Sequence, residues 1–488
     1  MFTIRKRLIR LFLVLLSLWF LAYLSVSIGD YSSSSDTADD AIQRADNSGG
    51  WKVRTPQMER PRVAVTATAA RRMKKKGIVG IVDMGGGEEE LEALVKQAES
   101  ELKVFVYTLP SWIQGQRGPA QDPNFCYNLA MDPTFFPNNE TRLYYMPEQK
   151  FPEYYSNVSA TRTTNPDEAD IFIVPHDYIC MTFLAYKHLE GVKSSIAILN
   201  WVKEQPTFKR RGGRDHVFIF LQDNGVFCDW WSNSGAILGH HVQPMIVAGN
   251  FGQDRGMPGC FRVGQDIVIP QFHDKAVLTD LTATRGHDGF FRGWIQPSEK
   301  CGARAREFVS KIPEHVGPER FLYNEGSVAD AYFGFAPAGH ACWSTRLYDT
   351  IMKLSIPVIV ADEAIEPFER FLDWEKFSVK ILASEVLPKG TASEEGWFMN
   401  KIHNFTHQFE ENLKVTGGNE KQMVAIDYVA QKRAALLNVQ PWFQWDEHAE
   451  KSAFKLFTVE LWCRTDKGRD NKFCQNPTSV FADKGSYF

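Results

Sequence analysis

Short apolar runs, each closed by polar or turn residues, recur through the middle of this 488-residue chain. They predict strands at residues 103–107, 171–174, 217–221 and 267–269. Their near-continuous hydrophobicity is typical of strands that are buried on both faces, as in parallel sheets. Residues 183–204, between two of these runs, have helical character, which predicts a strand–helix–strand unit and an α/β fold.

A second set of elements follows in the C-terminal half. Residues 332–336 predict a strand that enters the small-residue turn at 337–340. Ser344 is expected to cap the next helix, whose apolar side chains recur at helical spacing and which ends at Pro357. Residues 358–360 predict the following strand, which completes a βαβ unit.

These two sets divide near residue 280 and predict two Rossmann-like domains that face a cleft. We expect the first domain at residues 101–280 and the second at 281–440. Residues 441–488 are expected to form a C-terminal helix and tail. The amphipathic stretch 442–462 within them would pack back across the first half.

The N-terminus has the pattern of a membrane anchor. A basic segment at residues 1–10 precedes an uncharged run at 11–28, which as a helix matches the thickness of a bilayer's hydrocarbon core. An acidic flank follows, so the basic end is expected to be the cytoplasmic tail and the rest of the chain to be luminal. The alternative is a cleaved signal peptide with small residues at 25–27. Residues 29–100 are polar and predict a flexible, disordered luminal stem.

Composition agrees with a luminal, globular body. All eight cysteines lie beyond the apolar run and no CxxC pair occurs, which favours disulfides; Cys463 and Cys474 form the most local pairing. N-glycosylation sequons begin at Asn139, Asn157 and Asn404. A net charge of −4 and a pI near 6.3 give no argument for a nucleic-acid partner.

Candidate chemistry lies beyond the carboxyl ends of the predicted strands, where open α/β sheets bind ligands. The turn at Gly339 and His340 leads through Ser344 to a helix N-terminus, where free N–H groups and the helix dipole favour a diphosphate. Arg346 in the first turn can add positive charge, or pair with a neighbouring acid instead. Arg292, on a loop near the domain boundary, can also face phosphate.

Carboxylates complete the candidate site. Glu366, after the next strand, can accept hydrogen bonds from ribose hydroxyls, although loop carboxylates are common. Transfer to a hydroxyl needs a general base, for which His176, Asp177 and Asp223 are candidates; these residue types also serve as turn and cap residues. No Asp-x-Asp occurs, so we expect no metal-bound diphosphate, and arginine with the helix dipole would neutralise the phosphates.

The same segments resemble the exostosin-like glycosyltransferases, glycosyltransferase family 47. Residues 333–339 look like that family's strand and glycine turn, and 344–349 look like its Ser-x-Arg-Leu helix start. The resemblance runs in order from about residue 102 to 440, and its other matching segments are 165–175, 214–218, 356–360, 367–368 and 372–374.

This resemblance implies an inverting, metal-independent transferase of the GT-B type, without a cofactor, anchored as a type II protein in the Golgi membrane. The implied donor is a UDP-linked sugar and the implied acceptor a polysaccharide or glycoprotein glycan; complexes with other glycosyltransferases are also implied. It favours Arg346 and Glu366 as donor-site residues and leaves the general base unassigned.

The chain departs from the family pattern at the glycine turn. Many members have an arginine and an aspartate there, where this chain has Ala338 and His340. The alternative interpretation is therefore a catalytically silent glycan-binding or scaffold subunit. A luminal hydrolase is disfavoured, because neither a nucleophile elbow nor a paired-carboxylate motif occurs in the sequence.

Overall fold

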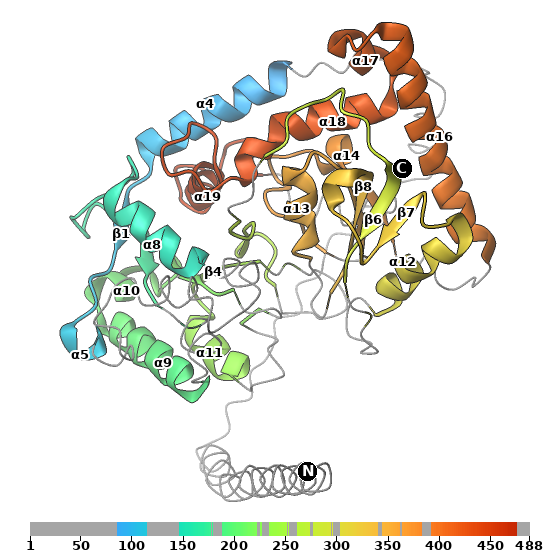
Figure 1. Ribbon diagram of the computed structural model, residues 1–488. Helices are drawn as coiled ribbons and strands as arrows, with labels where there is room; N and C mark the ends of the chain where they lie inside the picture. The colour runs from blue at the N-terminus through green and yellow to red at the C-terminus, as the bar shows by residue number, and fades with distance from the viewer. Residues whose placement is uncertain are drawn as a thin grey trace, which may run out of the picture. The chain divides into compact units, whose positions relative to one another are not determined.

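The computed structural model (Figure 1) describes residues 85–114, 146–176, 178, 188–221, 225–226, 234–250, 252, 261–273, 277–293, 295, 303–339, 344–361, 364–382 and 392–475. All of them belong to one compact unit, Gly80–Phe488. The predicted cytoplasmic tail, anchor and most of the stem lie outside these residues. Within the described ranges, no helix has both the length and the apolar character needed to cross a membrane.

The first sheet contains five parallel strands in the order β1-β2-β3-β4-β5. They are β1 (Val104–Val106), β2 (Ile171–Val174), β3 (His216–Ile219), β4 (Ile246–Gly249) and β5 (Ile267–Val268). Every residue of β2 to β5 is buried, as expected for a parallel sheet covered on both faces. The four predicted strands are confirmed, and β4 is an additional strand that the apolar pattern did not reveal.

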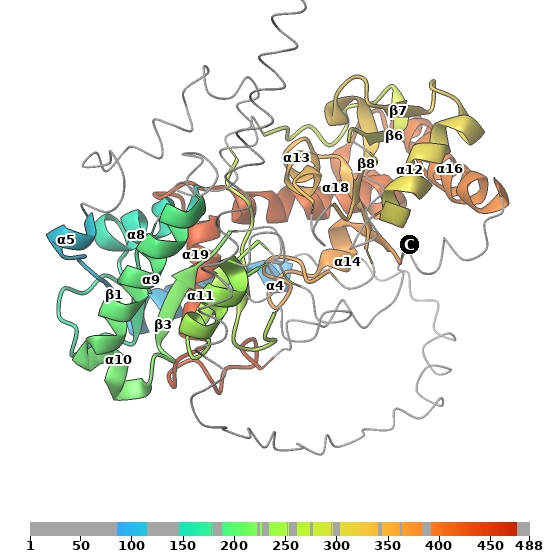
Figure 2. The ribbon, with the colours of Figure 1, turned by 90° about the horizontal axis from the view of Figure 1, so that it is seen from below.

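Helices connect these strands. The predicted helix at 183–204 is present as α9 (His188–Glu204) in the part of it that the structure describes. The others are α5 (Ser111–Gln114), α8 (Pro147–Asn157), α10 (Pro206–Arg211) and α11 (Ser234–Val242). Helices α9 and α11 pack against each other, as Figure 2 shows. The half therefore has the expected α/β organisation.

The second sheet is also fully parallel, in the order β10-β9-β8-β6-β7. Its strands are β6 (His287–Phe291), β7 (Phe321–Tyr323), β8 (Ala331–Pro337), β9 (Ile356–Val360) and β10 (Val379–Ile381). The chain leaves β6 for β7 on one side, and β8 then lies on the other side of β6. The topological switch point is thus between β6 and β8, which is where sheets of this kind bind ligands.

The helices of this half are α12 (Ala303–Val316), η3 (Val328–Asp330), α13 (Arg346–Met352), α14 (Trp374–Phe377), α16 (Ala392–Thr416), α17 (Glu420–Ile426) and α18 (Tyr428–Val439). Two details of the predicted βαβ unit were wrong. Thr345, not Ser344, is the N-cap of α13, and it makes no side-chain cap hydrogen bond. The helix ends at Met352 because Leu354 takes a left-handed backbone with φ 52°, so Pro357 lies inside β9.

The predicted stem overlaps a packed helix. Helix α4 (Gly85–Glu101) occupies residues that we expected to be disordered, and its apolar side chains Leu91, Leu94 and Ala98 are buried. It packs along α19 (Ala453–Trp462), and the two helices lie side by side in both views (Figure 1, Figure 2). The correction has a simple cause: α4 has few apolar residues, and the helix they pack along lies at the far end of the chain.

The C-terminal prediction is correct in outline. The stretch expected to be one helix is instead the short η4 (Gln440–Phe443), an irregular loop and α19. Phe457 of α19 packs on Phe151 of α8, with ring centroids 4.1 Å apart, so this segment does pack against the first half. Beyond α19, Cys463 and Cys474 lie at disulfide distance, with Cα atoms 5.1 Å apart. The other six cysteines lie outside the described residues.

Candidate functional site

The switch point of the second sheet brings two loops together. Arg292 and Gly293 follow β6, while Ala338 and Gly339 follow β8. Because β6 and β8 are hydrogen-bonded neighbours, these loops emerge at the same edge of the sheet. Three of the four residues at this point, all except Gly293, were singled out from the sequence. His340, the next residue along, lies outside the described residues.

Arg346 reaches from the start of α13 toward the first of these loops. Its Nε donates a hydrogen bond to the carbonyl oxygen of Arg292, and its guanidinium carbon lies 5.1 Å from the centroid of the Phe291 ring. Gly293 permits this placement, since a Cβ there would overlap the guanidinium group. Arg346 and Arg292, predicted together as phosphate contacts, are therefore adjacent in the structure, with Arg292 exposed.

Ser344 and Glu366 line a small cavity at the carboxyl ends of β8 and β9. Its volume is about 10 Å³, roughly the space of one water, and its other walls are apolar. The Ser344 hydroxyl is buried and has no hydrogen-bond partner among the described residues. The structure thus places two predicted donor-site residues in one enclosure, with one of them lacking a partner.

Burial raises the pKa of the Glu366 carboxyl group. Desolvation raises the pKa of Glu366 from 4.5 to about 7, and the positive charge of Lys380 on β10 partly opposes the rise. Glu369 follows on the same turn, and its Oε2 accepts a hydrogen bond of 3.4 Å from the Glu366 N–H. Burial and the neighbouring Glu366 raise the pKa of Glu369 well above its ordinary value. A carboxyl group with a pKa near neutrality in an enclosed site is a functional-site signal.

Two buried amide side chains lie at the carboxyl edge of the first sheet. Asn250 follows β4 and Gln271 follows β5, and the polar side-chain atoms of both lack partners within the described part of the chain. The two halves meet here, since the Ile365 N–H donates to the Gly252 carbonyl at 2.9 Å. The backbone of Gln271 also hydrogen-bonds the hydroxyl of Tyr348. These amides were not found from the sequence, because isolated Asn and Gln residues carry no motif.

Arg306 is a further residue that sequence reasoning missed. It lies on α12, and its Nε donates to the carbonyl oxygen of Ala338 at 3.2 Å. Burial lowers the pKa of its guanidinium group, which nonetheless stays positively charged at neutral pH. A cation therefore lies at the turn that contains Ala338. No motif in the sequence marks this arginine, because its partner Ala338 lies 32 residues away.

The structure does not identify which of the three candidates is the general base. His176 is buried, its ring stacks on Phe218 with centroids 4.0 Å apart, and its Nδ1 accepts a hydrogen bond of 3.3 Å from the Tyr178 N–H. It is not among the residues that line the Ser344–Glu366 cavity. Asp177 and Asp223 lie outside the described residues. The assignment of the base stays a prediction.

Two of the three sequons can be located. Asn157 is the exposed last residue of α8, and Asn404 is exposed on α16. The Thr406 hydroxyl of the Asn404 sequon is buried and donates to Asp288 at 2.5 Å. Asn139 lies outside the described residues. Across the described ranges, three or more His, Cys, Asp or Glu side chains are nowhere grouped so that they could hold a metal ion.

Comparison with known proteins gives a consistent result. The family model described as Exostosin GT47 domain matches residues 98–394, which is more than half of the chain and includes every strand of both sheets. A probable arabinosyltransferase from Arabidopsis thaliana is 25% identical over 47% of this chain and 53% of its own length. A probable glucuronosyltransferase from Oryza sativa is 27% identical over 59% of this chain and 69% of its own length.

A probable beta-1,4-xylosyltransferase from Arabidopsis thaliana is 27% identical over 58% of this chain and 69% of its own length. The matched part thus spans between about half and about two thirds of these relatives. The names of all three describe the transfer of a sugar, and each name gives a different sugar.

Proposed function

Since this chain belongs to the exostosin GT47 family, we propose that it is a glycosyltransferase that moves a sugar from a nucleotide-sugar to a glycan. The observation that carries the proposal is the Ser344–Glu366 cavity at the carboxyl ends of β8 and β9. Parallel α/β sheets bind nucleotides at this edge, and the cavity places the Glu366 carboxyl group there, near the start of the helix that carries Arg346. The transferase names of the relatives support the same reaction class.

The donor-site residues have two roles, which are to bind the ribose and to stabilise the diphosphate. Glu366, when ionised, accepts hydrogen bonds from the ribose hydroxyls of the donor. Arg346 and Arg306 flank the loops that follow β6 and β8, so their charge stabilises the diphosphate as it departs. Because these cations are fixed in place before the reaction, they carry out the neutralisation that a metal ion performs in other transferases. The donor is a UDP-linked sugar.

The reaction is an inverting transfer. An acceptor hydroxyl, deprotonated by a general base, attacks the anomeric carbon from the face opposite the diphosphate, and the nucleoside diphosphate leaves. The acceptor is a polysaccharide or a glycoprotein glycan. The enzyme works in the Golgi lumen, held as a type II protein by the segment at residues 11–28, and it associates with other glycosyltransferases.

Binding of the donor tests this function directly. A thermal-shift screen of UDP- and GDP-sugars should find one donor that stabilises the chain, and Arg346→Ala and Glu366→Ala should each abolish that stabilisation. Arg469→Ala is the matched control, since Arg469 is highly exposed and lies in the C-terminal segment. No stabilisation by any donor, together with no nucleotide release, would count against the enzyme.

The second candidate is a catalytically silent glycan-binding subunit. It is favoured by Ala338, which stands where many family members carry an arginine. The two candidates share a fold and differ in product: an active chain releases UDP when donor and acceptor are both present, and a silent subunit does not. The same purified chain, assayed for nucleotide release with each donor, separates them.

A further inference from the structure

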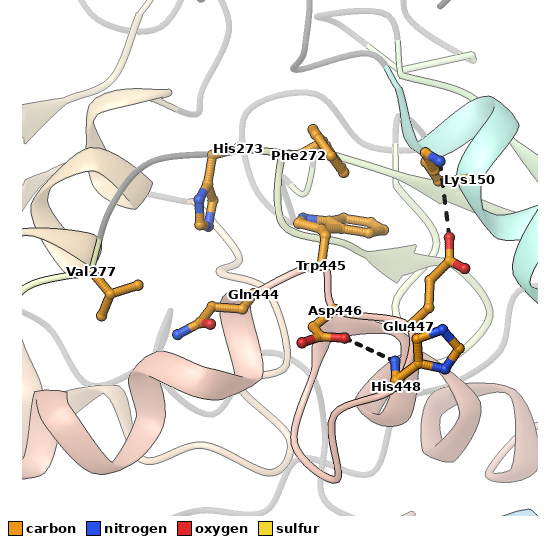
Figure 3. Close-up of a pocket in the computed structure, with 9 residues that line it drawn as sticks. All are labelled: Lys150, Phe272, His273, Val277, Gln444, Trp445, Asp446, Glu447 and His448. Carbon is orange, nitrogen blue, oxygen red and sulfur yellow. Dashed lines mark hydrogen bonds and ion pairs between the residues drawn. The ribbon is translucent and has the colours of Figure 1, made fainter. Parts of the chain in front are cut away.

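A second, larger pocket lies away from the cavity that holds Glu366. It has a volume of about 520 Å³, in the range of pockets that bind small organic ligands. Three parts of the chain form it: the start of α8, the segment that follows β5, and the loop between η4 and α19. Figure 3 shows the side chains that line it, which are Lys150, Phe272, His273, Val277, Gln444, Trp445, Asp446, Glu447 and His448.

Trp445 provides a fixed aromatic surface in this pocket. Its Nε1 donates a hydrogen bond of 2.8 Å to the carbonyl oxygen of Gln271, and its ring contacts those of Phe151, Phe454 and Phe272 at centroid distances of 5.0, 5.2 and 5.8 Å. The side chain is only partly buried, so part of the indole remains open to the pocket. In Figure 3 the ring lies between Phe272 and Asp446. An indole held on several sides loses little entropy when a ligand stacks on it.

The remaining walls are polar and carry a net negative charge. Asp446 and Glu447 are acidic, whereas Lys150 is the one lysine or arginine among the lining residues. Lys150 Nζ lies 3.9 Å from Glu447, and Asp446 accepts a hydrogen bond of 2.9 Å from the His448 N–H, as the dashed lines in Figure 3 show. Carboxylates of this kind accept hydrogen bonds from hydroxyl groups, and together they disfavour a phosphate or a uronate.

An open indole face beside carboxylates matches the chemistry of a neutral sugar ring. A pyranose or furanose presents apolar C–H groups on its faces and hydroxyl groups around its edge, so it can stack on Trp445 while its hydroxyls reach Asp446 and Glu447. We propose that this pocket binds a neutral oligosaccharide and is the acceptor-glycan site of the chain. The second half of this statement rests on the transferase function proposed above; the saccharide class rests on the pocket alone.

Gln271 connects this pocket to the donor cavity. Its carbonyl oxygen accepts the hydrogen bond from Trp445, and its backbone also hydrogen-bonds the Tyr348 hydroxyl. Tyr348 in turn is buried close enough to Glu366 for the negative charge of that carboxylate to affect its titration. Gln271 thus joins the aromatic surface of the pocket to Tyr348, a buried neighbour of Glu366.

Calorimetric titration of the full-length chain tests the saccharide class. The probes are xylotetraose, mannotetraose and β-1,4-galactotetraose as neutral ligands and tetragalacturonate as the acidic one. We expect at least one neutral probe to bind and to do so more tightly than tetragalacturonate by about tenfold. Absence of binding by all three neutral probes at millimolar concentration, or tighter binding of the acidic probe, would overturn the proposal.

Variants locate the binding to this pocket. Trp445→Phe keeps a ring in the core contacts but removes the Nε1 donor and half of the surface, and we expect it to weaken binding several-fold. Glu447→Gln keeps the shape of the side chain, removes its charge, and should narrow the difference between neutral and acidic probes. Glu450→Gln is the matched control, because Glu450 is exposed on the same loop and does not line the pocket. Equal affinities in Trp445→Phe and the unmodified chain would place the ligand elsewhere and refute the assignment.

The outcome is separable from that of the donor screen. If a neutral probe binds at Trp445 while no nucleotide-sugar stabilises the chain, the transferase proposal fails and the saccharide pocket stands. If a nucleotide-sugar binds and Trp445→Phe leaves both donor binding and transfer to each acceptor unchanged, the acceptor assignment fails while the transferase function stands.

Discussion

Ser344 and Glu366 line the same buried cavity, although one precedes α13 and the other follows β9. The Glu366 carboxyl group therefore lies in an enclosure whose other walls, apart from Ser344, are apolar. The Ser344 hydroxyl has no hydrogen-bond partner among the described residues. A carboxyl group in such an enclosure is costly to ionise, and its pKa near 7 follows from that cost. A ligand that donates hydrogen bonds to Glu366 would stabilise the ionised form and lower this pKa again.

The first prediction concerns the stability of the free protein. Burial raises the pKa of Glu366 in the folded chain to about 7, above its ordinary value of 4.5, so the folded state holds this proton more tightly than the unfolded state does. The stability that this proton contributes is therefore fully present below about pH 4.5. It is lost as the pH rises through 7, and the loss amounts to up to about 3 kcal/mol. We expect Glu366→Gln to leave stability nearly unchanged at pH 5 and to increase it at pH 8.

Urea unfolding at the two pH values measures this effect. Glu411→Gln serves as the control, because Glu411 is exposed on α16 and should show the same pH dependence as the unmodified chain. If Glu366→Gln and the unmodified chain lose stability equally between pH 5 and 8, the carboxyl group is not buried in the way the structure shows. The thermal-shift screen adds a second readout, in which Glu366→Gln should lose stabilisation by the donor.

The second prediction concerns Gly293, which makes room for the guanidinium of Arg346. Gly293→Ala would place a methyl group against that guanidinium and against the Phe291 ring, so Arg346 must move away from the loop that follows β6. We expect donor affinity to fall by about tenfold with little change in stability, since the displaced end of Arg346 is a flexible side chain.

Gly286→Ala is the matched control for this experiment. Gly286 lies just before β6, and a Cβ there would meet nothing within 4 Å. Donor affinity measured by thermal shift or calorimetry should therefore be unchanged in that variant. A loss of affinity in both variants would point to a general disturbance of β6, whereas no loss in Gly293→Ala would remove Arg346 from the donor site.

Most of the fold followed from the apolar pattern, for a physical reason. Strands that are buried on both faces must be continuously apolar, and the runs at 171–174 and 332–336 have no polar interruption. Strand β6 was missed because His287 and Asp288 give it a polar start; Asp288 is buried and satisfied by Arg320, at 2.9 Å, and by Thr406. Those partners lie far away in the sequence, so local patterns could not reveal them.

The site was predicted less completely than the fold. Arg346, Arg292, Ser344 and Glu366 were selected because ligands gather at the carboxyl ends of strands, and the structure places them in two adjoining groups. The buried amides and Arg306 carry no local signal, since their roles depend on which strand ends meet. Helix α4 was missed for the same reason, as its partner α19 is separated from it by nearly the whole body of the chain.

The third prediction concerns the bond between Cys463 and Cys474. It closes a loop with a sequence separation of 11, and the carbonyl of Cys474 accepts a hydrogen bond of 2.5 Å from the buried Arg370. Arg370 also lies 3.7 Å from Glu460, so the closed loop helps to satisfy a buried cation. We expect the double variant Cys463→Ala/Cys474→Ala to lose about 2–3 kcal/mol of stability.

Unfolding in urea, with and without dithiothreitol, measures that loss. Dithiothreitol should lower the stability of the unmodified chain more than that of the double variant, which has already lost this bond. Arg469→Ala is again a suitable control, because it lies within the same loop and its side chain is 71% exposed. A double variant as stable as the unmodified chain would show that the loop is held by its hydrogen bonds alone.

The fourth prediction concerns the contact between α4 and the C-terminal segment. Lys455 of α19 pairs with Glu99 of α4 at 2.5 Å, and both side chains are largely buried. Glu99→Lys would place two positive charges together in this partly buried position, and we expect it to destabilise the chain by about 1–3 kcal/mol. The exchanged pair Glu99→Lys/Lys455→Glu restores opposite charges and should recover most of the loss.

Glu90→Lys is the matched single change, since Glu90 pairs with Lys472 at the exposed surface and should cost well under 1 kcal/mol. Urea unfolding of the unmodified chain, Glu99→Lys, Lys455→Glu and the exchanged pair completes a double-mutant cycle. A cycle without coupling between positions 99 and 455 would contradict this prediction and show that the ion pair adds nothing to the contact between α4 and α19.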